Sequence, residues 1–295
     1  MMNPRTKNYF HLHFIIFIWG FTAILGALIT ISAIPLVWYR VSLATLFLYT
    51  YIVIKKIRMK VSTRVMFRFL LGGIFIALHW ITFFYAIKIA TVSIALTAMS
   101  TGALFVTLIQ WLVFRKKLIP YEFLFSLLAI VGLIIIFNAE TKYYIGISVA
   151  LISSFLSSCF SILNSSLIKE SNATVISFYE LLYASLFIGI ILVLNGSITI
   201  DFFMLSKSDW LYLILLASIC TAYAFAASTQ VLKSVSPFTM MLSINLEPVY
   251  GILLAIIIFK EKEIMTNNFY IGALLILITV ILNGVVKLKK KPKVN

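Results

Sequence analysis

Ten long apolar segments follow one another along the chain, and they restrict both the environment of the protein and its fold. They cover about residues 11–29, 35–54, 68–87, 92–113, 121–138, 145–168, 175–195, 209–231, 238–259 and 268–286. Each is long enough to cross a hydrocarbon core of ~30 Å at ~1.5 Å per residue, and none alternates at the period of two of a barrel strand. With 62% hydrophobic and 11% charged residues, the chain also has too few polar side chains to cover a water-soluble surface. The sequence therefore predicts an all-α integral membrane protein with ten transmembrane helices.

The basic residues are distributed unevenly over the predicted loops. Of 24 Lys and Arg residues, 18 fall on the side that carries both chain ends, 5 fall on the other side, and Arg40 lies within a segment. Cytoplasmic loops carry the excess of Lys and Arg, so both termini are predicted to be cytoplasmic in a multi-pass protein of the cell membrane. This topology accounts for most of the charge of +15 and argues against nucleic-acid binding. The basic tail at 288–295 is expected to contact lipid headgroups.

Cysteine and histidine placement argues against a metal site or an enzyme. Cys159 and Cys220 lie in apolar segments and have no partner at metal-ligand spacing. His11, His13 and His79 have no acidic neighbours at ligand spacing either. We therefore expect free, buried thiols, no metal, no cofactor and no catalytic residue.

A glutamate and a proline stand side by side near the middle of the ninth segment, 238–259. A charged residue and an imino acid are the residues that a membrane-spanning helix tolerates least. Pro248 removes the hydrogen-bond donor of the Ile244 carbonyl, so we expect a helix break at mid-membrane. Free backbone acceptors at that depth are tolerated where they face protein or a water-filled cavity. Glu247 and Pro248 are therefore predicted to form part of a cavity wall.

The two halves of the chain show a weak internal repeat. A shift of 145 residues aligns 85–105 with 230–250 and matches Lys88 with Lys233. With five segments in each half, the second copy starts on the opposite side of the membrane, and such inverted repeats commonly place a substrate site near the midplane. The predicted organisation is a first five-helix repeat at 11–138, a second at 145–287 and the basic tail at 288–295.

Several motifs resemble the EamA family of the drug/metabolite transporter superfamily. They are WG at 19–20, PLVWYR at 35–40, YAIKIATVSIA at 85–95 and LEPVYGILLAIIIFKEKEIMTNNFYIGALLI at 246–276. The resemblance covers about residues 11–287 and is most specific in the second half. It implies a secondary transporter, usually an exporter of amino acids or other small metabolites, with a central cavity between the halves. It does not imply a particular substrate.

Polar and aromatic residues at middle depths on separate segments mark the expected cavity wall. Glu247 is also the expected coupling residue, because a carboxyl at this depth can exchange a proton or meet a cationic group of the substrate. The alternative is a structural role in which Glu247 stabilises the helix break at Pro248. For His79 the sequence leaves two readings, substrate contact or a neutral histidine bonded to a serine. The predicted substrate-binding residues are Trp19, His79, Trp80, Asn164, Ser243 and Glu247.

Three further polar features have structural readings. The serines of the sixth segment follow helical spacing, and the sequence leaves open whether they allow close packing or line the cavity. They are Ser154, Ser158, Ser161 and Ser165. Arg40 is interpreted as a residue that snorkels to the interface or pairs structurally, with direct substrate contact as the less favoured alternative. Glu180 is interpreted as a helix-terminus residue or the partner of a lysine.

The combined prediction is a secondary active transporter that alternates access around a midplane cavity. Its partners are a small-molecule substrate, protons as the possible coupling ion, and the lipid bilayer. The alternative is a passive channel or a structural membrane subunit, and a membrane-embedded enzyme is the least favoured class. The sequence leaves open the substrate, the direction of transport and a homo-oligomeric state.

Overall fold

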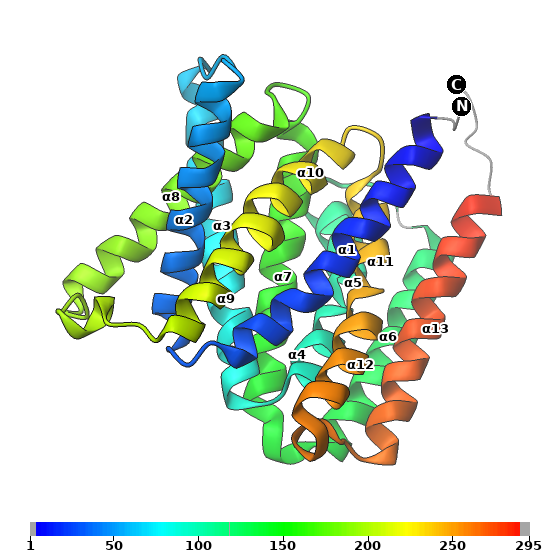
Figure 1. Ribbon diagram of the computed structural model, residues 1–295. Helices are drawn as coiled ribbons and strands as arrows, with labels where there is room; N and C mark the ends of the chain where they lie inside the picture. The colour runs from blue at the N-terminus through cyan, green and yellow to red at the C-terminus, as the bar shows by residue number, and fades with distance from the viewer. Residues whose placement is uncertain (1–3, 118, 290–295) are drawn as a thin grey trace.

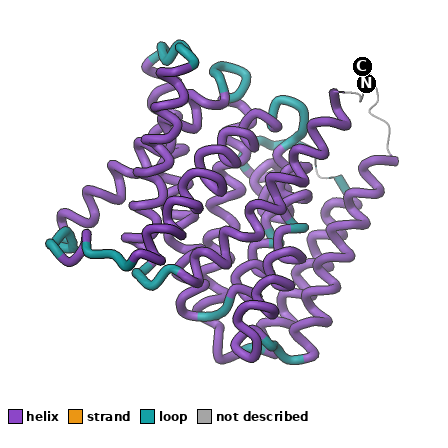
Figure 2. Tube along the Cα trace, in the orientation of Figure 1, coloured by secondary structure: helices purple, strands orange, loops and turns teal. Residues whose placement is uncertain are grey.

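The computed structural model describes residues 4–117 and 119–289, and all regular structure in these ranges is helical (Figure 2). The α-helices are α1 (Pro4–Leu28), α2 (Ala33–Ile54), α3 (Thr63–Ile89), α4 (Val92–Met99), α5 (Gly102–Leu112), α6 (Pro120–Ala139), α7 (Tyr144–Leu167), α8 (Ala173–Leu194), α9 (Lys207–Ala217), α10 (Ala224–Val231), α11 (Pro237–Ile244), α12 (Glu247–Phe259) and α13 (Asn267–Lys289). Short turns η1 (Thr141–Tyr143), η2 (Asp201–Phe203) and η4 (Lys260–Glu263) are 3₁₀ helices, and η3 (Ser218–Tyr223) is a π-helix. The tail at 290–295, and with it most of the predicted basic tail, lies outside the described residues.

Seven stretches of the described residues are long and apolar enough to cross a membrane. They include α1, α2, α3 and α8, the joined helices α4 and α5, the stretch from η1 through α7, and the stretch from α9 to α10. Part of α6 and part of α13 form shorter apolar helices. The all-helical class is therefore confirmed, while the count of ten crossings stays a prediction.

Helix starts follow the local sequence. The side chains of Ser62, Thr91, Asn172 and Ser206 accept hydrogen bonds from backbone N–H groups in the first turns of α3, α4, α8 and α9. Each satisfies a donor that the helix itself cannot pair. At the start of α6, Pro120 stands where its missing N–H costs nothing.

Two broken helices occur at matching places in the two halves. Helix α4 gives way to α5 at Ser100 and Thr101, and α11 gives way to α12 at Asn245 and Leu246, which is the 145-residue shift of the sequence repeat. Pro248 is the second residue of α12, so the interruption predicted for 238–259 lies just before it. The segment at 92–113 was expected to be one helix, yet it breaks in the same way without a proline. At this break, the N–H groups of Ser100 and Thr101 donate hydrogen bonds to carbonyls three residues earlier, as in a 3₁₀ turn.

The helices pack as one bundle, with α3 against α7 and α8, α2 against α8, α1 against α12, and α6 against α13 (Figure 1). Small residues bring some backbones close together. A Cβ atom on Gly20 of α1 would lie 2.9 Å from the Cβ of Tyr250 on α12, and one on Gly132 of α6 would lie 2.8 Å from the carbonyl oxygen of Gly272 on α13. Such close approach is the usual role of small residues between membrane helices.

The start of α1 and the end of α13 lie at one end of the bundle, here called the terminal end (Figure 1). The loops after α2 and α10 lie at this end too, whereas the loops after α1 and α12 lie at the opposite end. This arrangement agrees with an even number of crossings. The cytoplasmic assignment of the termini stays a prediction.

Three buried carboxylates join the first half of the chain to the second. Glu263 of η4 accepts hydrogen bonds from the first turn of α4, Asp209 of α9 from Thr30, and Glu140 from Thr266. Glu263 and Asp209 come from the second half, and Glu140 comes from the first. Their buried oxygens bind backbone or hydroxyl donors, which compensates for the loss of water.

Candidate functional site

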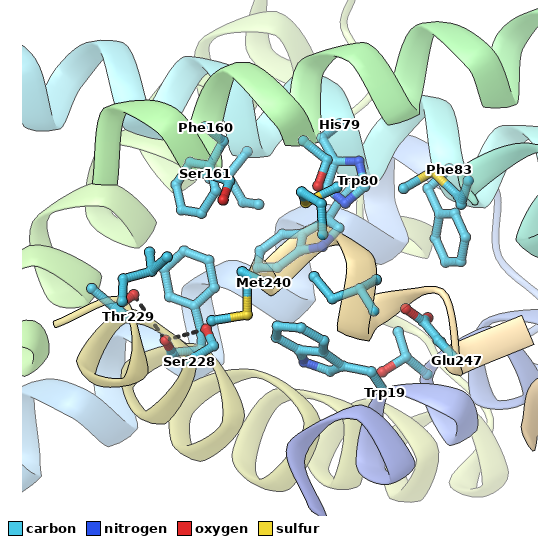
Figure 3. Close-up of a pocket in the computed structure, with 18 of the residues that line it drawn as sticks. Trp19, His79, Trp80, Phe83, Phe160, Ser161, Ser228, Thr229, Met240 and Glu247 are labelled. Atoms are coloured by element: carbon cyan, nitrogen blue, oxygen red, sulfur yellow. Dashed lines mark hydrogen bonds between the residues drawn. The ribbon is translucent and has the colours of Figure 1, made fainter. Parts of the chain in front are cut away.

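A central cavity lies where helices from the two halves meet (Figure 3). The volume that the centre of a water molecule can occupy in it is about 90 Å³. Since a single water needs roughly 10–15 Å³ by this measure, the space suits a small solute. Its wall is formed by Trp19, Thr22, Arg40, Ile76, His79, Trp80, Phe83, Met99, Ser157, Phe160, Ser161, Phe225, Ser228, Thr229, Leu232, Met240, Met241, Ile244 and Glu247. Eleven of these 19 residues have aromatic or aliphatic side chains, and the other eight have polar or charged ones.

Four of the six predicted binding residues lie in this wall. They are Trp19 on α1, His79 and Trp80 on α3, and Glu247 at the start of α12 (Figure 3). Asn164 and Ser243 lie outside it. Ser243 donates its hydroxyl hydrogen bond to the Thr239 carbonyl one turn earlier, at 2.9 Å.

Asn164 instead forms a buried pair with Glu180. Both side chains are fully buried, and Asn164 Nδ2 donates to the two carboxyl oxygens of Glu180 at 3.0 and 3.3 Å. A Cβ on Gly72 of α3 would lie 2.2 Å from Glu180 Oε1, so the glycine makes room for the pair. Within the described chain Glu180 has no lysine partner, so the expected lysine pairing is replaced by an amide on α7.

The serines of α7 combine the two roles that the sequence left open. Ser154 Oγ donates to the Met99 carbonyl at 3.1 Å, and Ser158 Oγ approaches the Gly102 carbonyl at 3.0 Å. Ser154 therefore binds a carbonyl at the break between α4 and α5, whereas the Ser158 hydroxyl lies between the Gly102 carbonyl and, at 2.8 Å, the Ser154 carbonyl of its own helix. Ser161 lines the cavity, and Ser165 donates to a carbonyl of its own helix.

His79 is anchored by a serine on the neighbouring helix. Its Nδ1 lies 2.8 Å from Ser153 Oγ and 3.0 Å from the Ser153 carbonyl oxygen, while Ser153 Oγ donates to the His79 carbonyl at 2.8 Å. A carbonyl oxygen only accepts, so Nδ1 carries a proton, and in the neutral ring Nε2 is then the acceptor. The ring is therefore a serine-bonded histidine that also faces the cavity, and its contact with a substrate stays a prediction.

Glu247 is partly buried and occupies the first turn of α12, where the helix dipole favours a negative charge. The one ion pair of the described residues does not involve Glu247, and its carboxyl interacts electrostatically with Arg40 in the same cavity wall. A carboxyl group so placed can take up a proton or meet a cationic group that enters the cavity.

Arg40 lies in the same wall and contradicts the snorkelling interpretation. Only 1% of the residue is exposed, and its Nε donates to Thr221 Oγ1 at 2.7 Å. The guanidinium carbon lies 3.8 Å from the ring centroid of Trp80 and 5.4 Å from that of Phe84. The structure brings this cation into the interior because α2 turns the side chain toward α3 and η3.

Sequence reasoning missed most of the aromatic and methionine residues of the wall. Phe83, Phe160, Phe225, Met240 and Met241 look like any other apolar residues of a membrane helix. Arg40 was the one further wall residue that the sequence could have marked as functional. A charged residue within a membrane segment is by default a candidate for a functional site.

No cluster of metal-binding side chains occurs among the described residues. Cys159 and Cys220 are free thiols, but only Cys220 is buried as expected, whereas Cys159 is partly exposed.

The comparisons with known proteins agree with this architecture. The model of the EamA-like transporter family matches residues 9–138 and again residues 144–285. No curated protein matches the chain. A solved structure described only as "Crystal structure of protein" is 17% identical and superposes with a TM-score of 0.70, over 96% of this chain and 99% of that one. At this identity the likeness concerns the fold alone.

Proposed function

This chain belongs to the EamA-like transporter family, and on that premise we propose that it is a secondary active transporter that exports small metabolites such as amino acids. Family membership makes it a multi-pass membrane protein with a small-molecule substrate. The proposal adds the direction, the coupling to a gradient and the site of binding.

The observation that carries the proposal is the central cavity walled by both halves. Trp19, Trp80 and Met99 come from the first matched region, whereas Phe225, Met241 and Glu247 come from the second. A site between two repeats can open to one side of the membrane or the other as the repeats rock against each other. The broken pairs α4/α5 and α11/α12 support the proposal, because interrupted helices are common at the substrate sites of transporters.

Within the cavity we assign substrate contact to Trp19, His79, Trp80 and Glu247. The aromatic rings provide apolar surface, and His79 offers Nε2 as an acceptor. Glu247 serves as the coupling residue, since its carboxyl takes no part in the one ion pair of the described residues and can carry a proton in one access state and meet a cationic group or water in the other. Both termini are assigned to the cytoplasmic face of the cell membrane, following the excess of basic residues.

The test is transport by the purified protein in liposomes, screened over amino acids and other small metabolites. We expect saturable flux that responds to an imposed pH gradient. Glu247→Gln keeps the size of the side chain but cannot ionise, so it should abolish pH-driven flux and preserve substrate exchange. Glu261→Gln, at an exposed position in η4, is the matched control and should behave as the unmodified protein.

Unsaturable flux would indicate a channel. A Glu247→Gln protein with unchanged pH dependence would remove Glu247 from coupling and direct attention to His79.

A further inference from the structure

We propose that Arg40 is the anion-recognition residue of the cavity, and that the transported compound carries a carboxylate attached to an apolar body. This inference deepens the proposed function and rests on it. It concerns a residue that the sequence placed among structural ones.

The position of Arg40 is fixed by a specialised piece of backbone. Thr221 accepts the Nε hydrogen bond of Arg40 at 2.7 Å and donates to the Leu216 carbonyl, five residues earlier, at 2.7 Å. Thr221 belongs to the π-helix η3, a rare element that occurs often at functional sites. The arrangement holds the guanidinium inside the bundle rather than at its surface.

The guanidinium is left with unused donor capacity. Nη1 is buried and has no hydrogen-bond partner, and the only ion pair within the described ranges joins Arg68 to Glu170. A buried donor of a charged group that lacks a hydrogen-bond partner is costly, and arginine cannot escape that cost by deprotonation. A cavity-lining arginine of this kind is a site for an acceptor that enters with the ligand.

Stacking on Trp80 decides which part of Arg40 can bind a ligand. With the guanidinium carbon 3.8 Å from the Trp80 ring centroid, the indole stabilises the charge, whereas all five N–H donors lie in the guanidinium plane. Nε is already used by Thr221, so the remaining donors are those of the two Nη atoms. Paired donors in one plane match the two oxygens of a carboxylate.

The rest of the wall selects the class of anion. Phosphate carries more charge than one arginine balances. Glu247 interacts electrostatically with Arg40 in the same cavity and, when ionised, repels a dianion more strongly than a monoanion. Apolar side chains such as Phe83, Phe160 and Met240 make up most of the remaining wall and suit a hydrophobic body. A monocarboxylate with an apolar or aromatic group satisfies both the cation and the wall, and an amino group near Glu247 is compatible with it.

The rival reading is that Arg40 only braces α2 against α3 and η3. Under that reading its removal weakens the fold but does not change which ligand binds. Ligand selectivity therefore distinguishes the two roles, whereas stability does not.

The experiment uses the full-length purified protein in lipid nanodiscs and three matched probes, 3-phenylpropionate, 3-phenylpropionamide and 3-phenylpropylamine, with affinities measured by calorimetry. The unmodified protein should bind the carboxylate about 10-fold or more tightly than the amide, as expected for hydrogen bonds to a charged group. Arg40→Gln should abolish this preference and leave the affinity for the amide unchanged. Arg40→Lys keeps the charge without the planar donors and should retain part of the preference.

The matched control is Arg64→Gln, an exposed arginine at the start of α3, which should keep the full preference. The comparison of probes on the unmodified protein needs no variant, so the proposal can be refuted even if Arg40→Gln does not fold. Equal binding of carboxylate and amide, failure of all three probes to bind at millimolar concentration, or a preference that survives in Arg40→Gln would each overturn it.

Failure of this inference is separable from failure of the proposed function. Saturable, gradient-driven transport in liposomes that is indifferent to a carboxylate would leave the function standing and remove Arg40 from recognition. Arg40-dependent carboxylate binding without any transport would do the reverse.

Discussion

The carboxylate of Glu263 holds the first turn of α4, and its replacement by glutamine should loosen the contact between the two halves. Oε1 accepts the N–H of Val92 at 2.9 Å, and Oε2 accepts the N–H and the hydroxyl of Ser93 at 2.9 and 2.7 Å. The residue is only 5% exposed, so water cannot easily replace these bonds. The contact joins η4 of the second half to α4 of the first.

The magnitude follows from what glutamine can still do at this position. One amide oxygen can keep the bonds from Ser93, but the amide nitrogen then faces the N–H of Val92, donor against donor. An unsatisfied buried N–H costs about 1–3 kcal/mol, and loss of the negative charge at a helix N-terminus adds about 0.3–1 kcal/mol. We expect Glu263→Gln to lower the free energy of unfolding by about 2–3 kcal/mol. At about 2–4 °C per kcal/mol, the midpoint of thermal unfolding should fall by about 4–12 °C.

The assay is thermal unfolding of the detergent-solubilised protein, with Glu261→Gln as the control. Glu261 belongs to the same short helix but is exposed, so its replacement should change the midpoint little. Ser93→Ala removes only the hydroxyl donor and should cost about 1 kcal/mol, and the double variant with Glu263→Gln should cost less than the sum. A Glu263→Gln midpoint equal to that of Glu261→Gln would show that the three bonds contribute nothing net.

Other features of the bundle yield three more predictions. Gly73→Ala should lower the free energy of unfolding by about 1–3 kcal/mol, measured by thermal unfolding. The new Cβ would lie 2.7 Å from the Glu180 carbonyl oxygen and 2.8 Å from the Tyr183 Cβ, and these atoms cannot move without shifting α8. Pro248→Ala should leave the break between α11 and α12 in place and change the midpoint of thermal unfolding little. The residue lies in the first turn of α12, and the matching break between α4 and α5 forms without a proline. A large loss of stability or of folded yield would contradict this. Reporter fusions at the two chain ends should place both in the cytoplasm, and an external C-terminus would refute the topology read from the basic residues.

The sequence by itself determined that the chain is a helical membrane protein, and it indicated the family. Hydrophobicity over some 20 residues is a local property, so the long apolar segments are visible without knowledge of their neighbours. The 145-residue repeat is also a property of the string, and it locates both broken helices, although only the one beside Pro248 carried a signal of its own. Trp19, His79 and Glu247 could be chosen because polar and aromatic groups at mid-depth are rare.

Only the tertiary structure decided which way each side chain faces. Asn164 and Arg40 are both polar residues within apolar segments, yet Asn164 turns to Glu180 while Arg40 turns to Trp80 and the cavity. The difference depends on the rotation of each helix about its axis and on partners such as Thr221, 181 residues away from Arg40 in the sequence. No local pattern encodes such distant pairings, because the desolvation of a charge is compensated only where the folded bundle brings a donor, an acceptor or an aromatic face into contact with it.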